Sequence, residues 1–160
     1  MFDKKLRKIA KFLIENNYTV STAESCTGGL LSSRFTDISG SSNFVKQNFV
    51  TYANEAKTEI LGVEAYILNN FGAVSRECAY AMAKGLHEKT KCELCLCTTG
   101  IAGPTGGTKE KPVGLVFVSV YFNNEIHVKN FKFPEFLPRK LMKFAFTQAA
   151  ICFAANVMSL

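Results

Sequence analysis

The sequence has no tryptophan and only two histidines, His87 and His127, among 160 residues. The histidines lie on different expected elements, and neither stands at a zinc-like spacing from a cysteine. Three of the six cysteines lie close together, at Cys92, Cys95 and Cys97. A strand over this segment would send Cys95 and Cys97 to one face and Cys92 to the other. We therefore expect no metal site, and reduced, buried thiols.

Long hydrophobic runs are also lacking. The most apolar stretch, FAFTQAAICFAANVM at 144–158, is interrupted by Thr147, Gln148 and Asn156. It falls short of the roughly 20 apolar residues that a membrane span needs, so it predicts a buried helix. The N-terminal MFDKKLRKIAKFLIENN has charges between its apolar residues and lacks the features of a secretory signal. We expect a cytoplasmic protein.

The composition is that of one globular domain. The chain is 48% hydrophobic and 20% charged, which suffices for a sizeable core without disulfides. We therefore predict a single domain over 1–160.

A net charge of +6 raises the possibility of a nucleic-acid partner. Five of the nineteen basic residues, however, lie in the first eleven positions, on the polar side of an expected helix over 3–16. No helix-turn-helix signal or RNP-like aromatic motif accompanies them, so a small anionic ligand explains the charge at least as well as nucleic acid does. The apolar face of that helix is expected to be Leu6, Ile9, Ala10, Leu13 and Ile14.

Helical and strand patterns alternate along the chain. Strands are expected at 18–25, 49–53, 93–100 and 113–122, the last forming a hairpin with 125–133. Helices are expected at 55–62, closed by Gly62, after the N-cap Ser75, and from about Arg139. This order predicts an α/β fold, a three-layer α/β/α sandwich with a mixed sheet. The expected buried residues are Cys78, Ala79, Met82, Ala83 and Leu86 in the middle helix, and Leu141, Phe144, Ala145, Gln148, Ala149, Cys152 and Phe153 in the last.

Two glycine-rich loops follow expected strands, TAESCTGG at 22–29 and TTGIAGPTGGTKEKPVG at 98–114. Ligands of open α/β sheets bind at the carboxyl ends of strands, so the two loops are expected to share a cleft. Ser25 or Thr27 is expected to cap a following helix and leave its free N–H groups pointing into that cleft. Neither loop matches a phosphate fingerprint. An anion-binding nest and a flexible turn remain equally open.

A third segment, 37–57, contains Ser41, Ser42, Tyr52 and Lys57. A serine needs a base to become a nucleophile, and a lysine serves only when its proton is removable near neutral pH. Lowering a lysine pKa from about 10.4 to about 7 takes roughly 4 to 5 kcal/mol. Alone, such a pair is weak evidence. A turn-capping role for Ser42, and Cys26 as a rival nucleophile near a helix N-terminus, stay open.

Taken together, TAESCTGG, GSS followed by VTYANEAK, GAVS, and GIAGPTGG with KPVG downstream resemble the CinA C-terminal domain family, which includes nicotinamide mononucleotide deamidases. The motifs run in the same order from about Thr22 to Arg139. The resemblance implies an amidohydrolase that converts nicotinamide mononucleotide and water to nicotinic acid mononucleotide and ammonia. It implies no cofactor and no metal. The molybdopterin-binding-like domain and pyrophosphatase activity of longer members are expected to be absent.

The resemblance also implies catalytic roles. Ser42 is expected to be the nucleophile, Lys57 its base, and Tyr52 the group that relays or orients the proton reaching the departing ammonia. Ser25 and Thr99 are expected to hydrogen-bond the carboxamide.

Further residues are expected to bind the substrate. Backbone N–H groups beside the loop glycines would stabilise the oxyanion, and Arg139 would hold the 5′-phosphate. The chain departs from the family pattern here, reading LPR in place of GDR and Lys143 in place of an arginine. The glycines concerned are Gly28, Gly29, Gly100 and Gly103.

Two alternatives to an enzyme remain, namely a non-catalytic nucleotide-binding or regulatory module and a protein linked to competence or DNA damage. The amidase is expected to be a homodimer, because the apolar C-terminal segment exceeds what one helix face buries.

Overall fold

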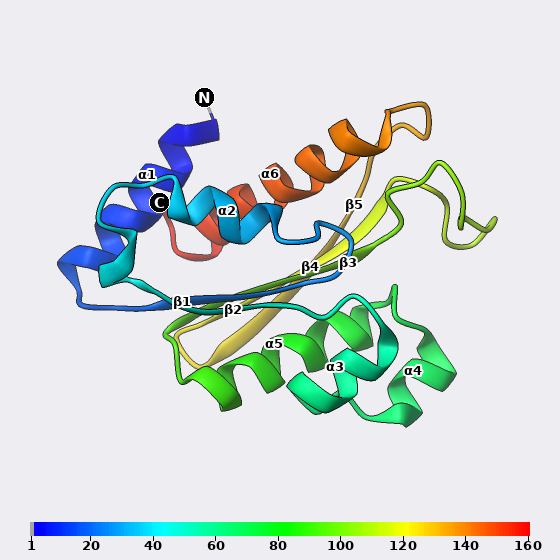
Figure 1. Cartoon of the computed structure of the whole chain (residues 1–160), viewed down its shortest axis with the longest axis horizontal. Coiled ribbons are helices and arrows are strands. Elements are labelled where there is room, and N and C mark those ends of the chain that lie inside the picture. Colours follow the sequence, from blue (N-terminus) through cyan, green and yellow to red (C-terminus); the bar gives the residue numbers. More distant parts are fainter. Residues whose placement is uncertain (1) are drawn as a thin grey trace.

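The computed structural model describes the backbone of residues 2–160 and the side chains of residues 4–160. Within that part of the chain, helices alternate with the strands of one sheet (Figure 1). In chain order the elements are α1 (Phe2–Glu15), β1 (Val20–Glu24), α2 (Leu30–Thr36), the 3-10 turn η1 (Ser41–Asn43), β2 (Val45–Val50), α3 (Asn54–Leu61), α4 (Ala65–Phe71), α5 (Arg76–Thr90), β3 (Leu94–Gly100), β4 (Leu115–Phe122), β5 (Glu125–Lys132) and α6 (Arg139–Val157).

The sheet is mixed, with strand order β2-β1-β3-β4-β5. Strand β1 pairs in parallel with β2 and β3, whereas β4 pairs antiparallel with both of its neighbours. Helices α1, α2 and α6 cover one face, and α3, α4 and α5 cover the other (Figure 1). The predicted three-layer α/β/α sandwich is confirmed. Because β1, β2 and β3 are parallel, their carboxyl ends meet at one edge of the sheet, which positions the site described below.

One expected helix cap, one expected helix end and one expected hairpin turn are confirmed. The Ser75 hydroxyl accepts the Cys78 N–H at 3.1 Å and caps α5. Gly62 ends α3 with φ 67°. Asn123 and Asn124, with φ 51° and 63°, form the β4–β5 hairpin turn.

The burial prediction for α6 was wrong in part. Leu141 and Phe144 are 56% and 42% exposed, while Met142 and Phe146 are buried. Apolar residues surround most of this helix, so the sequence pattern did not select the face that packs on the sheet. Gln148 and Ala149 are buried as expected; Ala145, Cys152 and Phe153 are only partly buried.

Two other predictions need correction, and one helix was not predicted. Ile14, assigned to the buried face of α1, is 44% exposed. The strand expected at 49–53 is Val45–Val50, because the chain leaves the sheet where the carbonyls of Thr51 and Tyr52 turn toward Lys57. Helix α4 was not anticipated.

The cysteine cluster also differs from the expectation. Cys92 precedes β3 rather than alternating within it, and it packs in the same buried cluster as Cys95 and Cys97. All six cysteines are free. Among the described residues, no group of three His, Cys, Asp or Glu side chains is arranged to hold a metal ion.

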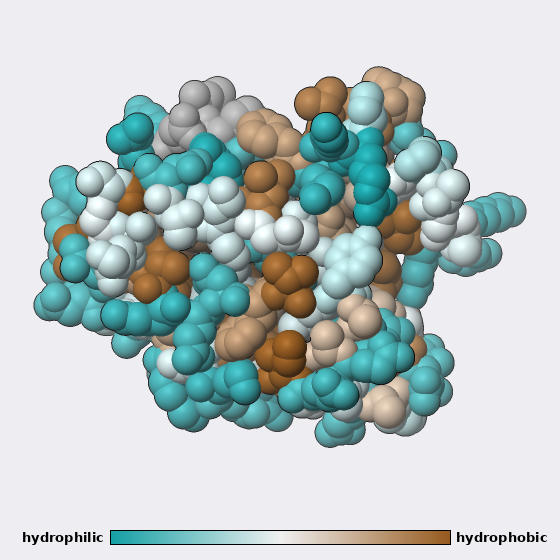
Figure 2. All heavy atoms as spheres, in the orientation of Figure 1, coloured by the Kyte–Doolittle hydropathy of each residue, from teal (hydrophilic) through white to brown (hydrophobic). Residues whose placement is uncertain are grey.

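Figure 2 shows the surface of the protein in the orientation of Figure 1. This face is largely hydrophilic, and the hydrophobic residues on it form separate groups. No helix in the described part of the chain is both long and apolar enough to cross a bilayer.

Candidate active site

The centre of the site is a buried lysine. Lys57 lies in the first turns of α3 and its side chain is fully buried. Its Nζ donates to the carbonyls of Thr51, at 2.9 Å, and Tyr52, at 3.1 Å. The third neighbour of Nζ is the hydroxyl of Ser25, at 3.2 Å. The three neighbours can accept the three hydrogens of an ammonium, and they equally suit a neutral amine, which donates to the two carbonyls and accepts from the hydroxyl.

Burial makes the neutral form accessible. Loss of hydration lowers the pKa of Lys57, and the thiols of Cys26 and Cys78 would oppose this only if they were ionised. Burial raises the pKa of Cys26 to about 12 and that of Cys78 to about 11. Both thiols therefore stay neutral near pH 7, and burial of the amine dominates. The same burial argues against Cys26 as the nucleophile.

Ser25 follows the last residue of β1 and is held by its backbone. Its N–H donates to the Thr98 carbonyl on β3 at 3.0 Å, and its own carbonyl accepts the Gly28 N–H at 3.1 Å. The turn then passes through Gly28 and Gly29, at φ 60° and 97°, a region where side chains are strained. Ser25 is half-buried beside the amine of Lys57, at the carboxyl edge of the sheet.

The structure does not bring Ser42 to Lys57. Ser42 is exposed in η1, which precedes β2, whereas Lys57 follows β2. A strand of six residues separates them, which spans about 20 Å. The predicted Ser42–Lys57 contact is therefore wrong within this chain. Spacing along the sequence could not identify Ser25 as the partner of Lys57, because Ser25 follows a neighbouring strand.

Tyr52 and Arg139 meet at the edge of the site. Tyr52 is 58% exposed, and its hydroxyl accepts from Nη2 of Arg139 at 3.0 Å. Nη1 of Arg139 donates to the Gly103 carbonyl at 2.6 Å. The guanidinium thus connects the β2–α3 segment to the second glycine loop. It is engaged with two neutral acceptors, which the phosphate prediction did not foresee.

The second loop adjoins the first, as predicted. Glu24 and Thr98 are partners in the β1–β3 register, so Ser25 is next to Thr99 on one face of the sheet. The Thr99 hydroxyl donates to the Ala73 carbonyl at 2.8 Å, which leaves its oxygen able to accept a bond.

Two glycines of this second loop have packing reasons to be glycine. A Cβ at Gly100 would lie 2.6 Å from the Leu115 carbonyl oxygen, and one at Gly103 would lie 2.4 Å from Val113. The loop is held against the start of β4 by this close approach, so a flexible turn is the poorer description.

Glu24 is a functional candidate that the sequence reasoning left without a role. It is the last residue of β1, and its fully buried carboxylate accepts the N–H groups of Gly29, Leu31 and Ser32 at 2.7–3.0 Å. The expectation that Ser25 or Thr27 caps α2 is therefore wrong, since Glu24 satisfies these amides. The polar donors clustered on both sides of Glu24 were the available signal.

A hollow of about 520 Å³ lies behind the first glycine turn. Gly28, Gly29 and Ser33 line one side, and Lys140 and Lys143 of α6 line the other. A Cβ at Gly28 would lie 3.2 Å from the Lys143 Nζ, so this amine is close to the turn that carries Ser25.

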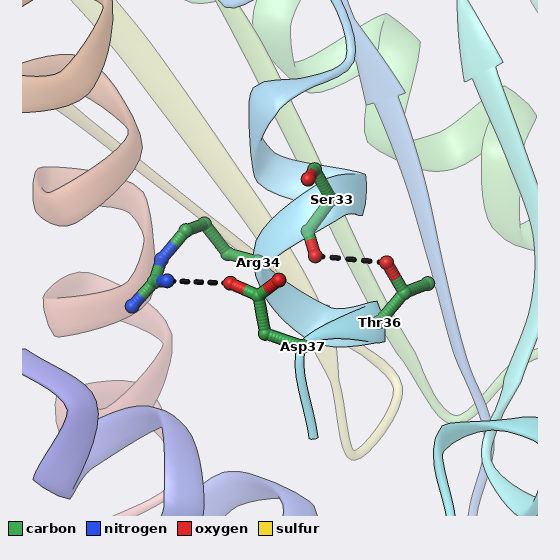
Figure 3. Close-up of polar contacts among 4 residues, drawn as sticks. All are labelled: Ser33, Arg34, Thr36 and Asp37. Carbon is green, nitrogen blue, oxygen red and sulfur yellow. Dashed lines mark hydrogen bonds and ion pairs between the residues drawn. The ribbon is translucent and has the colours of Figure 1, made fainter. Parts of the chain in front are cut away.

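Helix α2 forms the wall of this hollow. Figure 3 shows its C-terminal turn, where the Arg34 guanidinium points to the Asp37 carboxylate and the Thr36 hydroxyl donates to the Ser33 carbonyl at 2.8 Å. These contacts hold the end of α2 that is remote from Glu24.

The fold and the site together define a three-layer α/β protein with a serine–lysine pair beside two glycine-rich loops. The sequence matches the CinA C-terminal domain family over residues 3–158. The chain belongs to this family.

Relatives agree with that assignment. A competence-damage inducible protein of Clostridium tetani is 49% identical over 126 residues, 79% of this chain and 31% of the relative. A CinA-like protein of Syntrophus aciditrophicus is 48% identical over 89% of this chain and 34% of the relative. The chain thus spans about a third of the length of these relatives.

Solved structures share the whole fold. The competence/damage inducible protein CihA of Agrobacterium tumefaciens superposes with a TM-score of 0.91 at 39% identity, covering 97% of this chain and 95% of that one. The competence damage-inducible protein A of Klebsiella pneumoniae gives a TM-score of 0.92 at 26% identity, covering 99% of this chain and 97% of that one.

Proposed function

We propose that the protein is a nicotinamide-nucleotide amidohydrolase, which converts nicotinamide mononucleotide and water to nicotinic acid mononucleotide and ammonia. The reaction class rests on the family resemblance together with one observation, the 3.2 Å contact between the buried amine of Lys57 and the hydroxyl of Ser25. We assign the nucleophile to Ser25 in place of Ser42, because only Ser25 is within reach of the base.

The first half-reaction forms an acyl-enzyme. Neutral Lys57 takes the proton of Ser25 while its two N–H groups stay bonded to the carbonyls of Thr51 and Tyr52. Ser25 Oγ bonds to the carboxamide carbon, and the carbonyl electrons move to oxygen. Backbone N–H groups of the 25–29 turn are the candidate donors to this oxyanion.

Ammonia then leaves. The C–N bond breaks as the oxyanion collapses, and the departing nitrogen takes a proton that originates on the Lys57 ammonium, with the Tyr52 hydroxyl as relay. Arg139 donates to the Tyr52 oxygen, so the phenolic hydrogen is available to point toward the leaving group. Water attacks the ester with Lys57 again as base, which releases nicotinic acid mononucleotide and restores Ser25.

Residues on both glycine-rich loops are assigned to substrate recognition. The Thr99 oxygen can accept an N–H of the carboxamide, because its own hydrogen is donated to the Ala73 carbonyl. The 5′-phosphate is assigned to the hollow beside Gly28, where Lys140 and Lys143 supply positive charge. Arg139, at the start of α6, donates to the Gly103 carbonyl of the second loop and adds long-range attraction for the phosphate.

Ammonia release from nicotinamide mononucleotide by the purified protein tests the proposal. We expect turnover by the wild type and a stable acyl adduct on Ser25 when the reaction is quenched in acid and analysed by mass spectrometry. Tight nucleotide binding with no ammonia released would show that the protein is a nucleotide-binding module and not an amidohydrolase.

A further inference from the structure

The carboxylate of Glu24 is the most heavily hydrogen-bonded side chain of the site, and the mechanism above does not use it. It is fully buried immediately before Ser25. Besides the three amides of α2 and its leading turn, it accepts the hydroxyls of Thr27 and Ser32, both at 2.6 Å. The Thr22 hydroxyl lies 3.4 Å away. All of these donors are neutral, so the charge is stabilised by dipoles around one turn.

These bonds set the direction of a hydroxyl network. Thr27 has one hydroxyl hydrogen and donates it to Glu24, so the Thr98 hydroxyl, 2.8 Å away, must donate to Thr27. Ser32 likewise donates to Glu24, so the Thr22 hydroxyl donates to Ser32 at 2.7 Å. Both glycine-loop strands are thereby tied to the same carboxylate.

The network also occupies the backbone donors at the start of α2. Glu24 takes the N–H groups of Gly29, Leu31 and Ser32, which would otherwise be the free donors of the α2 N-terminus. The Thr27 side chain is held on one side by Glu24 and on the other by Thr98, which fixes the middle of the 25–29 turn.

We propose that Glu24 is a positioning residue, which holds the 25–29 turn so that the Ser25 hydroxyl faces Lys57. Glu24 acts through Ser25 and does not touch the substrate. This inference rests on the proposed amidase function.

Glu24→Gln tests it. The substitution keeps the size of the side chain but replaces one acceptor oxygen with an NH₂ group, which faces donors and leaves some of them unsatisfied. A misplaced nucleophile costs about 100-fold in rate. We expect kcat per folded molecule to fall by about that factor and KM to change by less than about 3-fold. The pH midpoint of kcat should stay unchanged, because Lys57 keeps its burial and its contacts with the Thr51 and Tyr52 carbonyls.

Two matched controls separate positioning from stability. Glu93→Gln makes the same chemical change where a carboxylate accepts the Thr19 N–H and hydroxyl at 2.7 and 2.8 Å, away from the site. Thr36→Val loosens the far end of α2. Both should keep kcat per folded molecule. If Glu24→Gln also keeps it and only lowers the unfolding temperature, the positioning role is overturned.

A second variant decides the matter if Glu24→Gln does not fold. Thr27→Val keeps the shape of the side chain and the carboxylate but cuts the link from Thr98 to Glu24. We expect about a 10-fold loss of kcat with KM retained. Wild-type kcat in a folded Thr27→Val protein would contradict the proposal.

A readout without the nucleotide distinguishes the failure of this inference from the failure of the proposed function. A small fluorophosphonate should label Ser25, and Glu24→Gln or Thr27→Val should slow labelling per folded molecule while Glu93→Gln does not. Labelling with that pattern but no ammonia release overturns the function and keeps the role of Glu24. Equal labelling of all variants overturns the role of Glu24 alone, and an unlabelled wild type overturns both.

Discussion

Ser25 and Ser42 are both serines beside glycine turns, but they lie at opposite ends of the parallel strands. They differ in burial and in their distance from a base. Ser25 is half-buried at the carboxyl edge, 3.2 Å from a dehydrated amine. Ser42 is exposed in η1 at the other edge. A hydroxyl is activated by its neighbours, so the edge where parallel strands end is decisive.

The largest expected effect comes from removing each serine in turn. Ser25→Ala should lower kcat/KM for nicotinamide mononucleotide by at least about 10³-fold, because the acyl-enzyme cannot form. Ser42→Ala should stay within about 2-fold, since its side chain contacts neither the base nor the loops. An inactive Ser42→Ala beside an active Ser25→Ala would reverse the comparison.

Lys57→Met is expected to be nearly as damaging, with about a 10³-fold loss of kcat. Methionine fills a similar volume without a base, so circular dichroism should report a folded protein. Lys46→Met, a change of an exposed lysine on the same β2–α3 segment, is the control and should retain activity. Full turnover by Lys57→Met would remove the amine from the mechanism.

Tyr52→Phe should lower kcat by roughly 100-fold, the lower end of the usual contribution of a positioned proton donor. KM should change less, because the ring and the neighbouring backbone remain. Steady-state ammonia release at saturating nucleotide measures the effect. A change confined to KM would make Tyr52 a binding residue rather than a proton relay.

The lowered pKa of Lys57 predicts two pH dependences. Its burial favours the neutral amine, so kcat/KM should rise with pH and level off below the ordinary lysine value of 10.5. Between that lowered pKa and 10.5, the unfolded chain binds a proton that the folded protein does not, so stability should rise with pH. Urea unfolding from pH 7 to 10 checks this rise, which Lys57→Met should lose.

The smallest expected effect is that of Cys26→Ala. Its buried thiol, with a pKa raised to about 12, stays protonated near neutral pH and cannot serve as a nucleophile. Activity should change by less than about 3-fold, and iodoacetamide should leave Cys26 unmodified in the folded protein. Rapid alkylation of Cys26 that abolishes turnover would make Cys26 a candidate for the catalytic nucleophile again.

Local signals in the sequence predicted much of this architecture. Ser75, Gly62 and the Asn123–Asn124 turn each carry their chemistry within a few residues, so the elements they bound were predictable. The meeting of the two glycine loops followed from the rule for carboxyl ends of parallel strands. The segment around Lys57 was also recognisable, because its motif is continuous.

The contacts that join separate elements were decided by the tertiary structure. Lys57 reaches Ser25 because β2 lies beside β1 in parallel, which no spacing along the chain expresses. Glu24 collects donors as far along the chain as Ser32, because the 25–29 turn folds back over it. The face that α6 buries was settled by packing on the sheet, since its apolar residues allowed several. The sequence by itself determined most of the elements and the chemistry available at their ends. The choice of partners came from strand order and burial, which depend on the whole chain at once.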